Sequence, residues 1–273
     1  EANKGIDEVG QKTSGLGEKL KSGLATAGKV AVAGVAAGAT AIGALGTKAV
    51  EAYADYEQLV GGVETLFKDS QDQVMDYANN AYKTAGLSAN EYMETVTSFS
   101  ASLLQSLDGD TSAAADKANL AITDMSDNAN KMGTDMTSIQ NAYQGFAKAN
   151  YTMLDNLKLG YGGTQAEMER LLADAEKISG IKYDISSYAD IVDAIHVVQT
   201  EMGITGTTAE EAASTIQGSF GMMKSAWQNL VTGMADPSQD LGVLVGNFTE
   251  SVVTFGNNVI PRIQELLPRI VEA

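Results

Sequence analysis

The stretch that decides the fold is residues 138–208, SIQNAYQGFAKANYTMLDNLKLGYGGTQAEMERLLADAEKISGIKYDISSYADIVDAIHVVQTEMGITGTT. Apolar residues recur in it at i, i+3 and i+4, the spacing that places them on one face of a helix. Glycines separate the apolar segments, because glycine readily adopts the left-handed backbone that ends helices. The pattern predicts three consecutive helices, of which the second starts after Thr164 and the third after Ser187.

Four polar residues are predicted N-caps of helices. Ser88, Thr164 and Thr208 are each followed three residues later by a glutamate. This is the pattern of a capping box, in which the two residues satisfy each other's backbone N–H groups. Ser187 is followed by Asp190, whose charge suits the positive N-terminal end of a helix.

The rest of the chain also follows helical spacing, and no proline occurs before Pro237. Alternation typical of a strand is confined to residues 181–185, which we interpret as a short linker between helices. The sequence therefore predicts an all-α protein, a multi-helix module with a long Ala/Gly-rich N-terminal helix and an apolar C-terminal helix.

Three regions are expected along the chain. Residues 1–60 are predicted to form an extended Ala/Gly-rich helix that ends at Gly61 and Gly62, and residues 61–236 a helical core module. Residues 237–273 are predicted to begin a further apolar helical region, kinked or stopped before Pro261. Because the chain starts at Glu1 without a methionine, we expect it to be part of a longer protein.

Residues 30–47, VAVAGVAAGATAIGALGT, carry no charge and lie between Lys29 and Lys48. Their length is close to the ~20 residues that cross a bilayer, which suggests a conditional membrane segment. Their many alanines and glycines also suit a helix that packs closely against another helix, since small residues four apart let backbones approach. Both interpretations remain open. The second one predicts a self-association face made of Gly34, Gly38, Ala41 and Leu45.

The composition argues against several kinds of chemistry. A formal charge of −17 does not suit sequence-specific binding to nucleic acid, which needs a basic surface. The chain has no cysteine and one histidine, His196, so thiolate catalysis and sites built from several Cys or His residues are excluded. His196 is interpreted as a residue at the border of a helix face. We expect no catalytic site, no metal and no cofactor.

Four ordered segments carry a resemblance to a known family. They are NAYQGFAKANYTMLDNLKLGYGGT (141–164), EMERLLADAEKISG (167–180), YADIVDAIHVVQTEMGITGTTAEEA (188–212) and SAWQNL (225–230). In this order they resemble the core of the tail tape-measure proteins of long-tailed phages and prophages of Gram-positive bacteria. The likeness extends in looser form over about residues 53–235, and the chain would be an N-terminal to middle portion of such a protein.

The resemblance implies a structural function without catalysis. Tape-measure proteins set the length of the tail tube, fill its lumen and assist the passage of DNA across the host envelope. The implied partners are copies of the same chain, the tail tube protein, tail-tip proteins, tail assembly chaperones and, at ejection, the host membrane. The implied locations are the host cytoplasm during assembly, the virion afterwards, inside the tail tube, and the host cell membrane during ejection.

A second hypothesis comes from a different class of protein. The uncharged residues 30–47 and the apolar helix predicted after Pro237 also suit a membrane-active helical protein, such as a pore former or a secreted effector. A cell-wall hydrolase is a third class, but the chain shows no nucleophile motif or metal-ligand cluster that would favour it.

Overall fold

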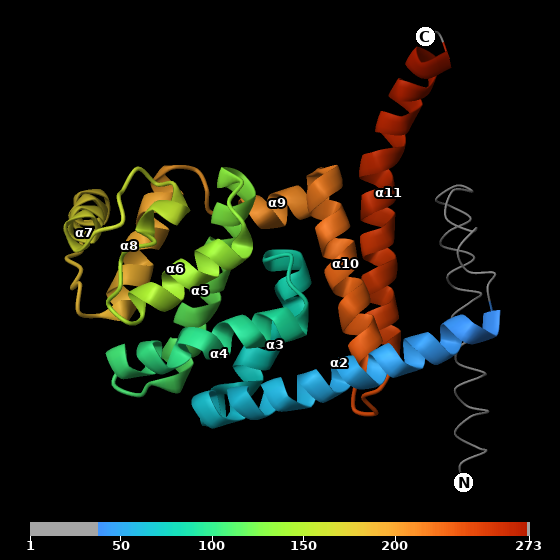
Figure 1. Ribbon diagram of the computed structural model, residues 1–273, viewed down its shortest axis with the longest axis horizontal. Helices are drawn as coiled ribbons and strands as arrows, with labels where there is room; N and C mark the ends of the chain where they lie inside the picture. The colour runs from blue at the N-terminus through green and yellow to red at the C-terminus, as the bar shows by residue number, and fades with distance from the viewer. Residues whose placement is uncertain (1–37, 272–273) are drawn as a thin grey trace. The chain divides into compact units, whose positions relative to one another are not determined.

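The computed structural model describes residues 38–271, and all regular secondary structure in this range is helical (Figure 1). The prediction of an all-α protein is confirmed. Gly34 of the predicted self-association face, with the rest of residues 30–37, lies outside the described residues. The elements are α2 (Gly38–Phe67), η2 (Lys68–Ser70), α3 (Gln71–Thr84), α4 (Ala89–Ser106), α5 (Thr111–Met132), α6 (Met136–Phe146), η3 (Leu154–Leu157), α7 (Gln165–Ser179), α8 (Tyr188–Glu201), α9 (Thr207–Ser214), α10 (Ile216–Gly233) and α11 (Leu241–Val271).

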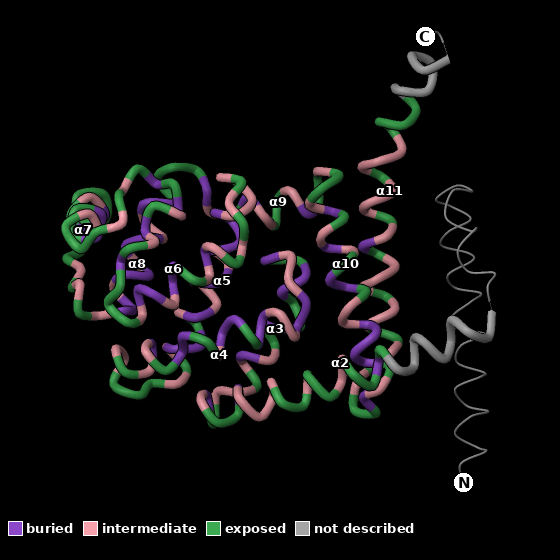
Figure 2. The backbone as a smooth tube through the Cα atoms, viewed as in Figure 1, coloured by how far each residue is buried: buried purple, intermediate pink, exposed green. Residues whose placement is uncertain are grey.

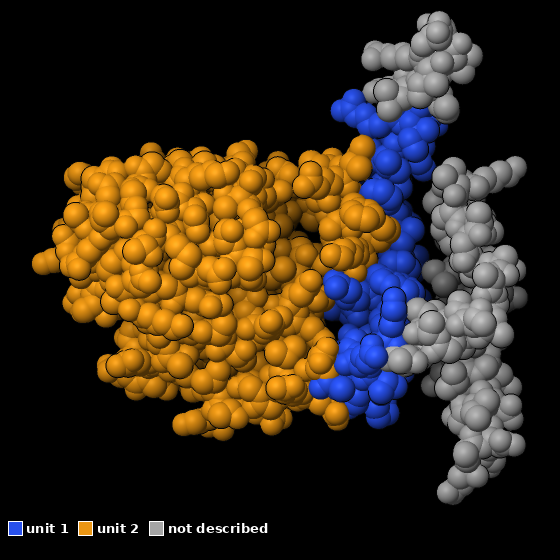
Figure 3. Space-filling model, in the orientation of Figure 1, with its two compact units in different colours: residues 1–54, 226–273 blue, residues 55–225 orange. Residues whose placement is uncertain are grey.

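The chain divides into two compact units, which Figure 3 colours separately. Unit 2 is Asp55–Ser225, and unit 1 contains, among the described residues, 38–54 and 226–271. The sequence pattern predicted a core module over 61–236, whereas the compact unit begins and ends somewhat earlier. Helices α2 and α10 each continue from one unit into the other, so neither boundary falls in a loop.

Unit 2 is built around α5. This helix packs against α3, α4, α6, α8 and α9, and α7 covers α8. Its inner face carries alanines with no exposed surface, such as Ala114, Ala118 and Ala121, which let the neighbouring helices come close. The buried stretches of these helices appear in Figure 2, and their apolar side chains form one continuous cluster from Val63 to Ile204.

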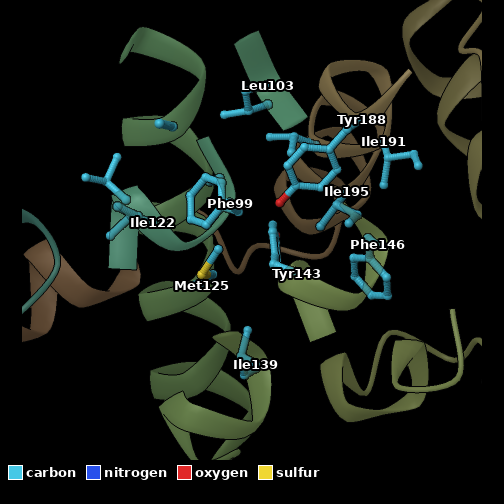
Figure 4. Packing of buried hydrophobic residues seen from close by; sticks show 14 of the residues in the cluster. Phe99, Leu103, Ile122, Met125, Ile139, Tyr143, Phe146, Tyr188, Ile191 and Ile195 are labelled. Carbon is cyan, nitrogen blue, oxygen red and sulfur yellow. The ribbon is translucent and has the colours of Figure 1, made fainter. Parts of the chain in front are cut away.

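Aromatic side chains pack against one another on the elements that surround α5. Phe99 of α4 and Tyr188 of α8 meet edge to face, with ring centroids 6.1 Å apart (Figure 4). On α6, Tyr143 lies 5.7 Å from Phe146 between ring centroids, and Phe146 in turn stacks on Tyr151. Such pairs add roughly 0.5–1.5 kcal/mol each beyond the burial of their area.

Unit 1 contains the second half of α10 and helix α11. Within it, Trp227 of α10 packs against Phe248 of α11, with ring centroids 5.2 Å apart. The turn between the helices holds Pro237, and Asp236 accepts hydrogen bonds there from the backbone N–H and the hydroxyl of Ser238. The predicted boundary at Asp236 and Pro237 is therefore a turn between two helices.

Two helices continue past residues at which the sequence pattern suggested an end. Helix α2 continues through Gly61 and Gly62 to Phe67, because Val63 and Phe67 on the next turn are fully buried in the core. Their burial outweighs the roughly 1 kcal/mol that each helical glycine costs relative to alanine. Helix α11 does not stop before Pro261 but runs through it, and a kink at this proline, the other predicted outcome, stays a prediction. A proline removes one hydrogen bond to the preceding turn, and the remaining bonds carry the helix on.

Candidate functional site

Four buried polar side chains and one half-buried polar side chain lie where α5 meets α8 and the start of α9. We call them the polar seam: Asp124, Asp127 and Asn128 of α5, and His196 and Gln199 of α8. Four of them have no exposed surface, and the side chain of His196 is 31% exposed. Helical spacing of three and four residues places each group on one face of its helix. Burying polar groups is costly unless they are hydrogen-bonded, so the partners of each residue matter.

Asp124 and His196 form the central contact of the seam. His196 Nδ1 lies 2.9 Å from Asp124 Oδ1 and 3.1 Å from Oδ2. Among the described residues, His196 is the only side-chain partner of this carboxylate. The pair therefore joins α5 to α8 through one bond between a buried acid and a half-buried base.

The surroundings shift the pKa of both groups upward. Burial raises the pKa of Asp124 to about 6, although the hydrogen bond with His196 acts in the opposite direction. The hydrogen bond with Asp124 raises the pKa of His196 above its usual 6.5, against the effect of burial. Both shifts mean that the folded protein holds protons at this site more tightly than ordinary Asp and His side chains do.

An ion pair lies beside this contact at the rim of the seam. Lys117 of α5 donates to Asp193 of α8, and both side chains are partly exposed. The negative charge of Asp193 raises the pKa of both Asp124 and His196. The positive charge of Lys117 lowers the pKa of His196. The acid–base pair thus sits next to one cation that is already paired with a carboxylate.

Asn128 and Gln199 extend the seam by one turn. Asn128 donates from Nδ2 to Gln199 Oε1 at 2.8 Å and to the backbone carbonyl of Leu157 at 2.9 Å. Gln199 Nε2 lies 3.4 Å from the carbonyl oxygen of Asp124. This network ties η3 and α8 to the same side of α5.

Asp127 fixes the start of α9, which corrects one prediction. Its carboxylate accepts from the backbone N–H groups of Gly206 at 2.6 Å and Thr208 at 2.7 Å. The helix begins at Thr207 with Gly206 as its N-cap, and the Thr208 hydroxyl is buried without a hydrogen-bond partner among the described residues. Thr208 is therefore not the cap that its capping-box pattern predicted, because a carboxylate from α5 takes that role.

The other predicted caps lie at helix starts. The Ser88 hydroxyl accepts from the N–H of Glu91, and Glu91 accepts from the N–H of Ser88, which completes a capping box before α4. Thr164 and Ser187 accept in the same way at the starts of α7 and α8. Glu167 does not return the bond to Thr164, since it accepts from the Gly162 N–H instead.

The predicted self-association residues are placed only in part. Gly34 is outside the described residues, whereas Gly38, Ala41 and Leu45 lie in the first turns of α2. Self-association through this face stays a prediction.

An Asp–His pair is chemically able to act as a base, so its surroundings decide what it can do. A hydrolase of the serine type would need a nucleophile hydrogen-bonded to the second ring nitrogen, His196 Nε2. Within residues 38–271, no hydroxyl bonds that nitrogen, and no group of three His, Asp or Glu side chains could hold a metal ion. The arrangement suits holding helices together and binding a proton.

The sequence pattern placed His196 at a helix border, which matches its partial exposure, but it did not reveal the polar seam. Asp124, Asp127 and Asn128 are spaced as an apolar face would be, and that regular spacing on α5 was the available signal. It does not identify partners that lie some seventy residues further along the chain.

No helix within residues 38–271 combines the length and the apolar content that crossing a membrane requires. Comparison of the chain with known protein families, with curated proteins and with solved structures finds no match in any of the three.

Proposed function

We propose that this chain is part of a phage tail tape-measure protein, a structural protein that fills the tail tube and whose length sets the length of the tube. The observation that carries the proposal is the ordered series of four segments between residues 141 and 230 that resembles this family. These segments fall on consecutive helical elements, from α6 to α10, that follow one another without strands.

A mechanical role is compatible with an all-helical chain. A helix rises 1.5 Å per residue, so the number of residues converts directly into length once the helices are drawn out end to end. The roughly 170 residues of unit 2 would then span about 260 Å as continuous helix. The compact unit described here would be the form of the chain outside that extended state.

The acidic character of the chain supports the same role. With a formal charge of −17, the protein is repelled by the phosphates of DNA and would leave the tube ahead of the genome without holding it. We propose copies of the same chain, the tail tube protein, tail-tip proteins and tail assembly chaperones as partners. At ejection, residues 30–47 would contact the host membrane.

Tail length tests the proposal directly. In the phage or prophage that encodes the protein, an in-frame deletion of residues 55–225 is expected to shorten the tails seen by electron microscopy by up to about 260 Å. Replacement of the same residues by an unrelated helical sequence of equal length is the matched control and should restore tail length. Tails of unchanged length after the deletion would contradict a length-setting role for this part of the chain.

A further inference from the structure

We propose that the His196–Asp124 pair is a proton-operated latch. While the pair carries a proton it holds α8 against α5. Loss of that proton weakens the polar seam, which also contains the Asp127 carboxylate that fixes the start of α9. This inference concerns the compact unit itself and does not depend on the proposed function.

The geometry makes the pair sensitive to a single proton. Asp124 has no exposed surface, so its carboxylate cannot exchange its partner for water, and His196 Nδ1 is within hydrogen-bond distance of both of its oxygens. His196 is partly exposed, so its ring can exchange a proton with solvent. The buried acid is thus joined to solvent protons through one side chain.

The charges around the pair decide which protonation state the fold favours. Asp127 of α5 and Asp193 of α8 are negative, and Lys117 of α5 is the cation that acts on His196. Tyr143 of α6 is neutral, because burial and, after it, the Asp124 charge raise its pKa. The charged groups that shift the pKa values of the pair all belong to α5 and α8. No charged group of α4, α7 or α9 shifts either pKa.

Deprotonation therefore leaves an unbalanced charge in the interior. With one proton, the pair is a neutral combination of carboxylate and imidazolium. Without it, a buried negative charge remains beside Asp127 and Asp193, while Lys117 is already engaged by Asp193. An uncompensated buried charge is strongly unfavourable, so the packing of α5 against α8 weakens.

The direction of the pH effect follows from the two shifts. The pKa of His196 is raised on folding. Its contribution to the free energy of unfolding is therefore fully present below about pH 6.5 and is lost as the pH rises through the higher pKa of the folded state. The pKa of Asp124 is also raised, to about 6, so protonation of Asp124 likewise stabilises the folded state, at lower pH. Both groups bind more protons in the folded state, so the free energy of unfolding decreases as the pH increases.

The weakening is expected to be local. Asn128 and Gln199 bridge α5 and α8 one turn from the pair, and Asp127 holds the first N–H groups of α9. The contacts of α3 with α4 contain no member of the polar seam. Amides of α8 and α9 should therefore lose protection before those of α3 and α4.

The single histidine of the chain provides the first test, because its ring signals in an NMR titration need no further assignment. We expect His196 to titrate above about 6.5 in the folded protein. In Asp124→Asn its pKa should fall toward the ordinary value. The substitution Glu176→Gln removes an exposed carboxylate of α7 that does not shift the pKa of either group, and it should leave the titration unchanged. A histidine that titrates at or below about 6.5 in the folded wild-type protein would overturn the proposal.

Urea unfolding between pH 6 and 9 provides the second test. The unfolding midpoint of the wild-type protein should fall as the pH rises through the His196 titration, and His196→Gln should lack this fall. An identical fall in both proteins would overturn the proposal. Should neither variant fold, hydrogen exchange of the wild-type protein decides. Protection of α8 amides, corrected for intrinsic exchange, must then decline together with the ring titration, and protection that stays constant refutes the latch.

Discussion

At the scale of single residues, Asp127 acts as a cap for a helix to which it does not belong. The N-cap of α9 is Gly206, which has a φ of 85° and no side-chain oxygen to offer the first N–H groups of the helix. The Asp127 carboxylate supplies both acceptors from α5, and its negative charge lies at the positive end of the α9 dipole. One buried residue thereby determines where α9 begins.

Replacing Asp127 should reveal this role. Asp127→Ala leaves the N–H groups of Gly206 and Thr208 without their acceptors, and we expect a loss of about 2–3 kcal/mol in the free energy of unfolding. Thr208→Val removes only a hydroxyl that has no hydrogen-bond partner within residues 38–271 and should change stability by less than about 0.5 kcal/mol. Urea denaturation of both variants measures the difference. A larger loss for Thr208→Val than for Asp127→Ala would mean that Thr208 is the cap after all.

Residues of this kind mark the limit of what the sequence could predict. The spacing of Asp124 and Asn128 on α5 indicates a common face, but it does not say that His196 and Gln199 lie opposite. Local patterns such as the capping box at Ser88 are predictable because both partners lie within one turn. The apparent capping box at Thr208 failed because a more distant carboxylate competes for the same N–H group.

At the scale of elements, two of the glycines of α10, Gly218 and Gly221, lie in different surroundings. A Cβ added at Gly218 would overlap the backbone carbonyl of Glu211 in α9, whereas a Cβ at Gly221 would meet nothing within 4 Å. Gly218 is needed because α9 and α10 approach each other closely there, since a single residue separates the end of α9 from the start of α10. Gly221 only adds backbone freedom to the unfolded chain.

These two glycines give a matched pair of variants on one helix. Gly221→Ala should stabilise the protein by up to about 1 kcal/mol, because alanine is the better helix former. Gly218→Ala has the same intrinsic advantage, but it must displace backbone, and we expect it to destabilise by about 1–3 kcal/mol. Thermal unfolding followed by circular dichroism compares them. Equal effects of the two substitutions would show that α9 and α10 do not approach as described.

Helix starts were more predictable than helix ends. Ser88, Thr164 and Ser187 stand directly before α4, α7 and α8, because an N-cap needs a side-chain oxygen at one defined position. Gly61 and Gly62 were expected to end α2, yet the burial of apolar residues beyond them keeps the helix intact. A glycine only permits a helix to end, and tertiary packing decides whether it does.

At the scale of the whole molecule, helical periodicity was sufficient for the fold class, since every described element is helical. The arrangement around α5 was not predictable, because the sequence does not state which apolar faces meet. The alanine-rich face of α5 accommodates several helices at once, and their order is set by how individual side chains fit. The unit boundaries inside α2 and α10 were missed for a related reason, since a continuous helix carries no boundary signal.

Unit 2 should fold on its own, because the apolar cluster from Val63 to Ile204 lies entirely within it. A fragment of residues 55–233, which keeps α10 whole, is expected to give helical circular dichroism and one cooperative thermal transition. A fragment of residues 55–187 lacks α8 and with it Ile191, Ile195 and the partners of the polar seam on α5. It should lose cooperative unfolding, since α5 would then expose buried carboxylates and apolar surface to water. Cooperative unfolding of the shorter fragment at an equal midpoint would contradict a core that closes around α5 through α8.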